Sequence, residues 1–444
     1  MLKAGMSIRD ISPGPGEELA GYPHYPRNNT GIHDPLYAAC MYLDNGEEEL
    51  AMVTLDLLFF SKKHVRTVRR AAEKCCGIKG SNIMISCSHT HSGPWASGRL
   101  DIESLEAGKQ QNTDYIWELT KKITEAIEEA KKQSFEAEFA SGTVLCGAED
   151  GIGGNRRCPG GPHDPQVSVM AVRDRKRRVR GIFVNYTLHP TYIHEWSNVV
   201  TADYPGYLRI QLKELEEHAV IGFSQGASGN QSGRYYRKGE SFEEAERVGR
   251  TLGKAADTIL DKAVWRSELE IRVAGTEIPL ELRDFETEEV LEQRVREYKR
   301  IYDDLYARYG SKKKREEYYL WQNANLKTLG AEDQLGYIRM WKRGERIELK
   351  EDEKPAEIQV IRLGNTCVIG VPGEVFVEYG LYVKAMAGYT TLIFNSLTNG
   401  CLPGYLYTPE SLAEGGYETD TSMLGRNFGR HMVEQILTII EKVK

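Results

Sequence analysis

The sequence has no long apolar run, no regular pattern of cysteines and no low-complexity linker. A membrane-spanning helix needs about 20 consecutive apolar residues, and no stretch of this chain approaches that length. The eight cysteines form no CxxC pair, and Cys75 and Cys76 are adjacent, so we expect reduced thiols rather than a disulfide framework. These absences argue against a membrane protein and against a small disulfide-stabilised one.

An excess of basic residues is also lacking. The chain has 58 Lys and Arg against 65 Asp and Glu, which gives a net charge of −7. Because nucleic-acid binding depends on neutralising phosphates, no nucleic-acid partner is expected. The first five residues, Met1 to Gly5, contain no apolar stretch typical of a signal peptide, and we therefore expect a cytoplasmic location.

The composition that is present is typical of a folded protein. Charged residues make up 28% of the 444 residues and hydrophobic ones 40%, the ordinary balance of a globular chain. A chain of this length can form one large domain or two smaller ones. Since no linker interrupts the sequence, we expect a single domain over residues 1–444.

Apolar runs bounded by turn residues alternate with segments of helical spacing. Residues 37–43 and 50–55, joined through Asp44-Asn45-Gly46, predict a β-hairpin. Other strands are expected at 82–87, 167–172, 181–188, 219–223 and 366–371, and helices at 61–76, 114–132 and 421–442. This alternation predicts an α/β fold in which mixed β-sheets are flanked by helices.

Residues 287–348 differ from the rest in being rich in Glu, Lys, Arg and Tyr at helical spacing. We interpret them as a helical insertion of two or three helices that lies over the site. The insertion matches none of the motifs described below, so we expect it to influence specificity and subunit contacts. A homo-oligomer is left open.

Polar residues follow three of the predicted strands. His89 and His91 follow residues 82–87, His189 follows 181–188, and Glu374 follows 366–371. In extended backbone, residues i and i+2 point to the same side, so His89 and His91 can converge on one point. Two imidazoles and a carboxylate form the three-ligand set of a catalytic zinc, although each residue alone is more often a structural one. The pattern therefore predicts a metal site at the strand ends.

Longer segments in the same order along the chain match those of a known family. They are Ala4-Gly5, Asp10 to Pro13, Gly31 to His33, Ser88 to Pro94, His189-Pro190-Thr191, Asp203 to Tyr207, Phe223 to Gly229, Pro372-Gly373-Glu374 and residues 399–418. On these segments the sequence resembles the neutral ceramidases and their bacterial relatives. The resemblance extends over nearly the whole chain.

That resemblance implies a zinc-dependent hydrolase of an amide or ester bond, in which an activated water attacks the carbonyl. One Zn²⁺ per chain is expected, and the ligands that it implies are His89, His189, Glu374 and Tyr405. His91 then lies near the zinc-bound water. By the same resemblance, Arg156 and Tyr417 contact the scissile carbonyl.

Three further side chains are predicted to contact the substrate, which we expect to be a small or lipid-like amide or ester. They are His194, shortly after His189, His24 in the N-terminal loop, and Gln225 after the run 219–223. Two other functions are considered: a zinc-dependent lyase or isomerase acting on a small soluble substrate, and a non-catalytic zinc-binding protein.

Overall fold

The computed structural model of the chain describes residues 1–97, 112–310, 315–344 and 354–444. Two main β-sheets form its centre. The larger has, in spatial order, β11 (Val220–Gln225), β9 (Val179–Tyr186), β8 (Gln166–Asp174), β6 (Phe135–Leu145), β1 (Lys3–Asp10), β3 (Tyr37–Asp44), β4 (Glu49–Leu55) and β5 (Ile83–Cys87). The smaller has β13 (Ile271–Ile278), β14 (Ala356–Leu363), β15 (Thr366–Gly370) and β17 (Thr391–Asn395).

Both sheets are mixed. In the larger sheet, β4 with β5 and β9 with β11 are parallel, and the other neighbours are antiparallel. Three short pairs lie outside the main sheets. They are β2 (Gly31–Ile32) with β10 (Val199–Val200), β7 (Gly154–Asn155) with β12 (Gln231–Ser232), and β16 (Glu374–Val375) with β18 (Tyr405–Leu406).

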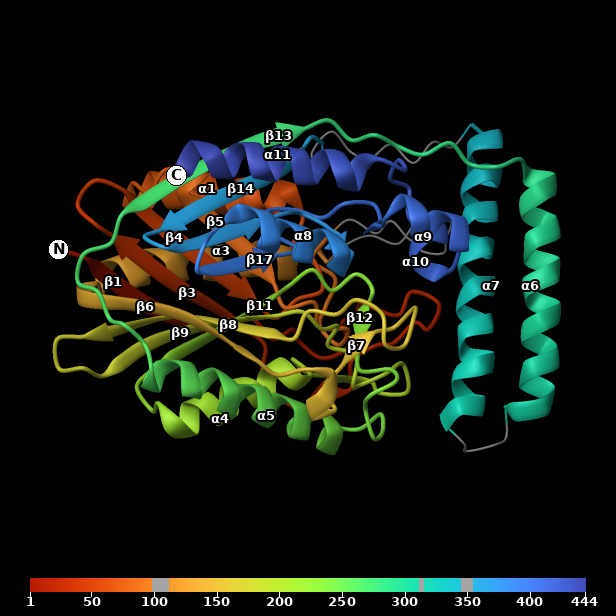
Figure 1. Cartoon of the computed structure of the whole chain (residues 1–444), viewed down its shortest axis with the longest axis horizontal. Coiled ribbons are helices and arrows are strands. Elements are labelled where there is room, and N and C mark those ends of the chain that lie inside the picture. The colour runs from red at the N-terminus through yellow and green to blue at the C-terminus, as the bar shows by residue number, and fades with distance from the viewer. Residues whose placement is uncertain (98–111, 311–314, 345–353) are drawn as a thin grey trace.

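Helices surround the two sheets, covering their outer faces and one end of the molecule (Figure 1). They are α1 (Lys62–Cys76), α3 (Thr113–Lys132), α4 (Tyr204–Leu215), α5 (Phe242–Asp261), α6 (Glu288–Tyr309), α7 (Arg315–Lys342), α8 (Val377–Ala387), α9 (Pro409–Glu414), α10 (Tyr417–Asp420) and α11 (Phe428–Val443). One apolar cluster joins α1 and α3 to the larger sheet, another joins α4 and α5 to its β8–β9–β11 side, and a third joins α8 and α11 to the smaller sheet.

The two sheets pack face to face, and strand β3 shows how. Its alternate residues Ala39, Met41 and Leu43 join side chains of both sheets in one buried cluster. Cys40 and Tyr42 point the other way, into the cluster beneath α1 and α3. A strand that is buried on both faces reads as a continuous apolar run, as residues 38–43 do. The fold is therefore a four-layer arrangement of helices, two sheets and helices.

The predicted α/β fold class is confirmed, and most predicted elements occur within a few residues of their expected bounds. Ser61 accepts a hydrogen bond from the His64 N–H at the start of α1. The last helix begins at Phe428 rather than at residue 421, so that part of the prediction was wrong. The reason is tertiary: Leu424 forms a β-bridge with Leu282, and the Gly425 N–H donates to the Glu281 carbonyl at 2.7 Å.

The segment predicted as a helical insertion contains α6 and α7, which stand side by side at one end of the molecule (Figure 1). Residues 311–314 and 345–348 of that prediction lie outside the described residues. Helix α7 packs against the short helix α10. Within the part of the chain that the structure describes, no helix combines the length and apolar character needed to cross a membrane.

Candidate metal centre

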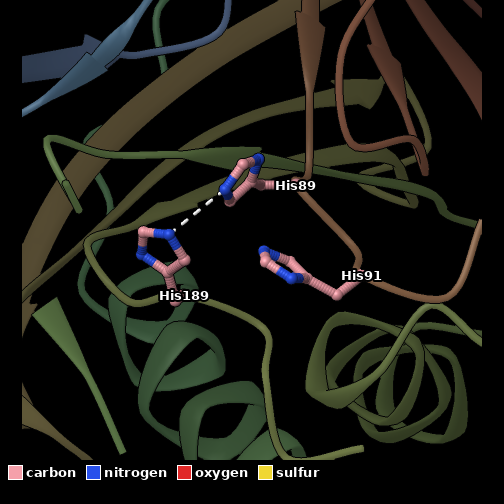
Figure 2. A group of neighbouring side chains, drawn as sticks. All are labelled: His89, His91 and His189. Atoms are coloured by element: carbon pink, nitrogen blue, oxygen red, sulfur yellow. Dashed lines mark hydrogen bonds between the residues drawn. The ribbon is translucent and has the colours of Figure 1, made fainter. Parts of the chain in front are cut away.

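His89, His189 and Glu374, predicted from three separate strand ends, meet in the interior. His89 lies two residues after β5, His189 three residues after β9, and Glu374 opens β16. The Nε2 atoms of His89 and His189 are 3.2 Å apart, and the dashed line in Figure 2 marks this contact. Glu374 Oε2 lies 3.0 Å from His189 Nε2 and 3.3 Å from His89 Nε2. The three atoms form a compact triangle with nearly equal sides.

The hydrogen bonds of the two rings show which nitrogens carry protons. His89 Nδ1 lies 3.1 Å from the Leu58 carbonyl, and His189 Nδ1 lies 2.8 Å from the Ser228 carbonyl. A carbonyl only accepts, so both Nδ1 atoms donate. Burial, with Arg156 adding to it, lowers the pKa of His189 to about 4, which leaves this ring neutral with an unprotonated Nε2.

This donor set fits a metal ion. Two imidazole nitrogens and a carboxylate oxygen face one another within a small buried space, and a bound cation would satisfy all three at once. Tetrahedral zinc with bonds of ~2.0–2.1 Å has its ligand atoms roughly 3.3 Å apart. The observed separations of 3.0–3.3 Å are close to that spacing. The residues present therefore fit zinc.

The backbone at His89 is turned rather than extended. His89 has φ 69°, in the left-handed region that non-glycine residues rarely adopt. The N–H groups of Ser88 and His89 donate to the carbonyls of Leu55 and Leu57, which fixes this turn against the preceding loop. We expected extended backbone to direct His89 and His91 to the same side. That part of the expectation was wrong, because the backbone beyond the end of β5 at Cys87 turns at His89.

His91 nevertheless lies beside the triangle. Its ring centroid is 4.9 Å from that of His89 and 5.7 Å from that of His189. Candidate ligand atoms of the three histidines lie within 4.8 Å of one another. Both ring nitrogens of His91 are buried without a hydrogen-bond partner among the described residues. Burial, followed by the neighbouring His89, lowers its pKa well below the usual range, so the ring is neutral.

Tyr405 reaches the centre through the β16–β18 pair, in which it stands opposite Glu374. Its hydroxyl accepts a hydrogen bond from Arg156 Nη2 at 3.2 Å. Arg156 also donates from Nε to Glu418 Oε1 at 2.7 Å and from Nη2 to the Gly229 carbonyl. Arg156 thus donates three hydrogen bonds to other residues of the chain. It orients Tyr405 and also lines the cavity.

A cavity of about 300 Å³ opens beside the three ligands. Tyr417 lines it, and burial keeps the pKa of its hydroxyl well above the usual range, so this group remains a donor. The predicted His24 and His194 also line it. His194 Nδ1 donates to Glu195 at 2.9 Å, and its Nε2 accepts from Arg237 at 2.9 Å.

Gln225 is the one predicted substrate contact that does not line this cavity. Its amide nitrogen donates to the Leu188 carbonyl at 2.6 Å and to Ser228 Oγ at 2.7 Å. Leu188 precedes His189 in the chain, and the Ser228 carbonyl accepts a hydrogen bond from His189. Gln225 therefore holds the two residues that position His189. We therefore correct its assignment from a substrate contact to a supporting one.

Two features of the site were missed from the sequence. Glu418 accepts hydrogen bonds from the buried Arg156 and from Arg157 Nη1 at 2.9 Å, so it joins two arginines. Gly229 lies against β16, where an added Cβ would come within 2.9 Å of the Glu374 carbonyl oxygen. The position of Glu418 next to Tyr417 in the sequence could have indicated its role. No local pattern indicates the second.

Comparison with known proteins gives consistent results. No protein-family model matches the chain. A 241-residue region, 48% of this chain, is 24% identical to the neutral ceramidase of Pseudomonas aeruginosa, of which it covers 34%. The matched region therefore spans about a third of that relative's length.

The fold comparison extends over the whole chain. A crystal structure of the neutral ceramidase from Pseudomonas aeruginosa superimposes with a TM-score of 0.74 at 19% identity, over 99% of this chain and 75% of the other. A structure described as ceramidase complexed with C2 gives a TM-score of 0.72 at 17% identity, over 98% and 74% of the two chains. The chain therefore has the fold of the neutral ceramidases, in agreement with the resemblance seen in the sequence motifs.

Proposed function

We propose that this chain is a zinc-dependent hydrolase of amide bonds, and that it also accepts related esters. One zinc ion would be held by His89, His189, Glu374 and Tyr405. The observation that carries the proposal is the triangle of two unprotonated imidazole nitrogens and a carboxylate oxygen, 3.0–3.3 Å apart. The name of the relative that matches in sequence and fold makes a ceramide-like amide one candidate substrate.

The metal would supply the nucleophile. Zinc lowers the pKa of a coordinated water to about 7, so that no strong base is required. His91 has two unpartnered nitrogens beside the ligands, and it would accept a proton there and return it to the departing amine. The Tyr417 hydroxyl would donate to the oxygen on which charge develops.

Arg156 has a supporting part in this proposal. It donates to the Tyr405 hydroxyl and is itself fixed by Glu418. A positive charge at this hydroxyl favours the deprotonated form that a metal ligand requires. The guanidinium therefore helps Tyr405 bind the metal, and its place in the cavity wall also brings it near a substrate carbonyl.

Metal content is the first test. We expect purified protein to hold one zinc per chain by elemental analysis, and His189→Ala to hold far less than one. The matched control is His218→Ala, which changes an exposed histidine paired with Glu217 on the surface. Hydrolysis of a panel of N-acyl amides and esters should be lost with zinc in the first variant and retained in the control. Full zinc in His189→Ala would contradict the ligand set.

Product analysis then separates hydrolysis from the other functions considered. In water enriched in heavy oxygen, hydrolysis places one solvent oxygen in the new carboxylic acid. A lyase or isomerase would leave the acid unlabelled or form none. A protein that binds zinc stoichiometrically and converts no member of the panel would support the non-catalytic alternative.

A further inference from the structure

Helix α7 forms one wall of the cavity beside the metal ligands. Eight of its residues line the cavity: Tyr318, Trp321, Gln322, Asn325, Leu326, Leu329, Asp333 and Tyr337. Successive members are one, three or four residues apart, the spacing of one side of a helix. A single helix outside the two sheets thus supplies much of the surface that a substrate would touch.

The middle of this wall is apolar. Leu326 and Leu329 lie there, and both are partly exposed to the cavity. Other parts of the cavity add Leu58, Phe59 and Leu402 to the apolar surface. Cavities that bind small molecules are mostly apolar with a few polar groups that fix orientation. This lining is therefore suited to the nonpolar part of a substrate whose reacting group lies at the histidines.

Contacts with the body of the protein fix α7 in position. Asn323 accepts from Arg234 Nη1 at 3.0 Å and donates to the Tyr235 hydroxyl at 2.9 Å. Gly330 lies so close to α10 that an added Cβ would be 2.9 Å from the Asp420 Cβ and 3.3 Å from the Tyr417 Cα. The distance between the α7 wall and the Tyr417 side of the site is therefore set by direct packing.

The volume of this cavity, which is partly open to solvent, limits how much of a substrate it can bury. A volume of about 300 Å³ is at the lower end of the ~300–1,000 Å³ typical of sites for drug-sized ligands. Such a cavity holds one short nonpolar group beside the reacting bond. It does not enclose the two long chains of a membrane lipid.

We propose that the cavity side of α7 sets the substrate class, binding a short nonpolar group of the amide and gaining nothing from a longer acyl chain. This inference rests on the proposed function for its reacting bond, and Leu326 and Leu329 are its specificity-determining residues. Each methylene that becomes buried should raise kcat/KM about fourfold, the factor that corresponds to ~0.8 kcal/mol. The increase should stop when the cavity is full.

The test uses the zinc-loaded full chain and one amine acylated with acetyl, hexanoyl, dodecanoyl or hexadecanoyl groups. Wild-type kcat/KM should rise from acetyl to hexanoyl and show no further gain at the longer chains. Leu329→Ala should extend the increase to a longer chain, and Leu329→Trp should shorten it. The control is Leu320→Ala, the same change on the same helix at a residue that is 52% exposed and outside the cavity lining.

A continuous rise to hexadecanoyl in the wild type would overturn the inference, as would equal effects of the Leu329 and Leu320 substitutions. Binding of the corresponding fatty acids, measured by calorimetry, gives a second readout that needs no turnover. If no amide is cleaved but fatty-acid affinity shifts with chain length in the Leu329 variants alone, the amidase proposal fails and the α7 inference stands. If amides are cleaved but neither kcat/KM nor fatty-acid affinity changes its chain-length dependence in the Leu329 variants, the amidase proposal stands and the α7 inference fails.

Discussion

Glu418 shows how one residue outside the ligand set can organise the centre. It is buried and accepts from Arg156 and Arg157, and Arg156 in turn donates to Tyr405. Burial alone would raise the pKa of Glu418, but the two arginines hold it at about 2. The carboxylate is therefore ionised in the folded protein at neutral and mildly acidic pH.

We expect Glu418→Gln to destabilise the fold by about 3–5 kcal/mol at pH 7, because it leaves the buried Arg156 without its counter-charge and removes one partner of Arg157. Since the folded pKa of Glu418 is depressed, its contribution is present above the unfolded pKa and is lost as pH falls from about 4.5 toward 2. Urea unfolding at several pH values measures this. Glu414→Gln, at an exposed partner of Arg157, should cost under about 1 kcal/mol. If the difference in unfolding free energy between the wild type and Glu418→Gln stayed constant from pH 7 to pH 3, the stability would not be linked to the protonation of Glu418.

The two tyrosines of the site should have separable roles. Tyr417→Phe removes a hydroxyl that donates to the developing charge, and we expect kcat to fall about 10²–10³-fold with zinc content unchanged. Tyr405→Phe removes a ligand and should weaken zinc binding as well as lower turnover. Zinc titration with a competing chelator, together with steady-state kinetics, distinguishes the two. Identical behaviour of the variants in both measurements would argue against these assignments.

At the scale of elements, the short strand β16 depends on the loop after β11. The Gly229 N–H donates to the Val375 carbonyl at 2.8 Å, and the Gly229 carbonyl accepts from Arg156. An added Cβ at Gly229 would lie 3.0 Å from both the Val375 backbone and the Phe376 ring. The loop and the strand that carries Glu374 therefore approach as closely as a glycine permits.

Gly229→Ala should push β16 away and displace Glu374, at a cost of about 1–3 kcal/mol in stability, the usual range for overpacking. Zinc affinity should fall in parallel, because Glu374 moves relative to His189. The matched control is Gly239→Ala, where an added Cβ meets nothing within 4 Å. Thermal unfolding and zinc titration of both variants provide the measurements. Unchanged zinc affinity in Gly229→Ala would show that β16 can relax without moving its ligand.

For the whole molecule, the metal centre connects the two halves of the fold. His89 and His189 follow strands of the larger sheet, whereas Glu374 follows a strand of the smaller one. A metal bound by all three would add a link between the sheets, which are also joined by hydrogen bonds from Asn185 and Ser224 to Asn395. The ligands are far apart along the chain, and the unfolded chain has no equivalent site.

Removal of zinc should therefore destabilise the entire fold. With free zinc a thousandfold above its Kd, the expected loss on chelation is about 4 kcal/mol. Chemical unfolding with and without a chelator measures this difference. His189→Ala provides the reference, because its stability should not respond to the chelator. A wild type that is equally stable in both conditions would mean that zinc does not bridge the sheets.

Local patterns in the sequence were sufficient to predict the main elements and three candidate metal ligands. Apolar runs that end in His89, His189 and Glu374 were recognisable because strand burial and strand ends leave local signals. Tyr405, Arg156 and Tyr417 could be assigned only through the resemblance to a family, since nothing in their local sequence marks a site. Periodicity also predicted helices in the 287–348 segment.

Only the tertiary structure decided how these parts meet. It showed that Gln225 supports His189 rather than lining the cavity, that Arg156 is held by Glu418, and that one side of α7 completes the cavity. The physical reason is that periodicity describes one element at a time. Contacts between two sheets, a loop and a helix depend on how all of them pack, and apolar residues on several sides of α7 do not indicate which side faces a cavity.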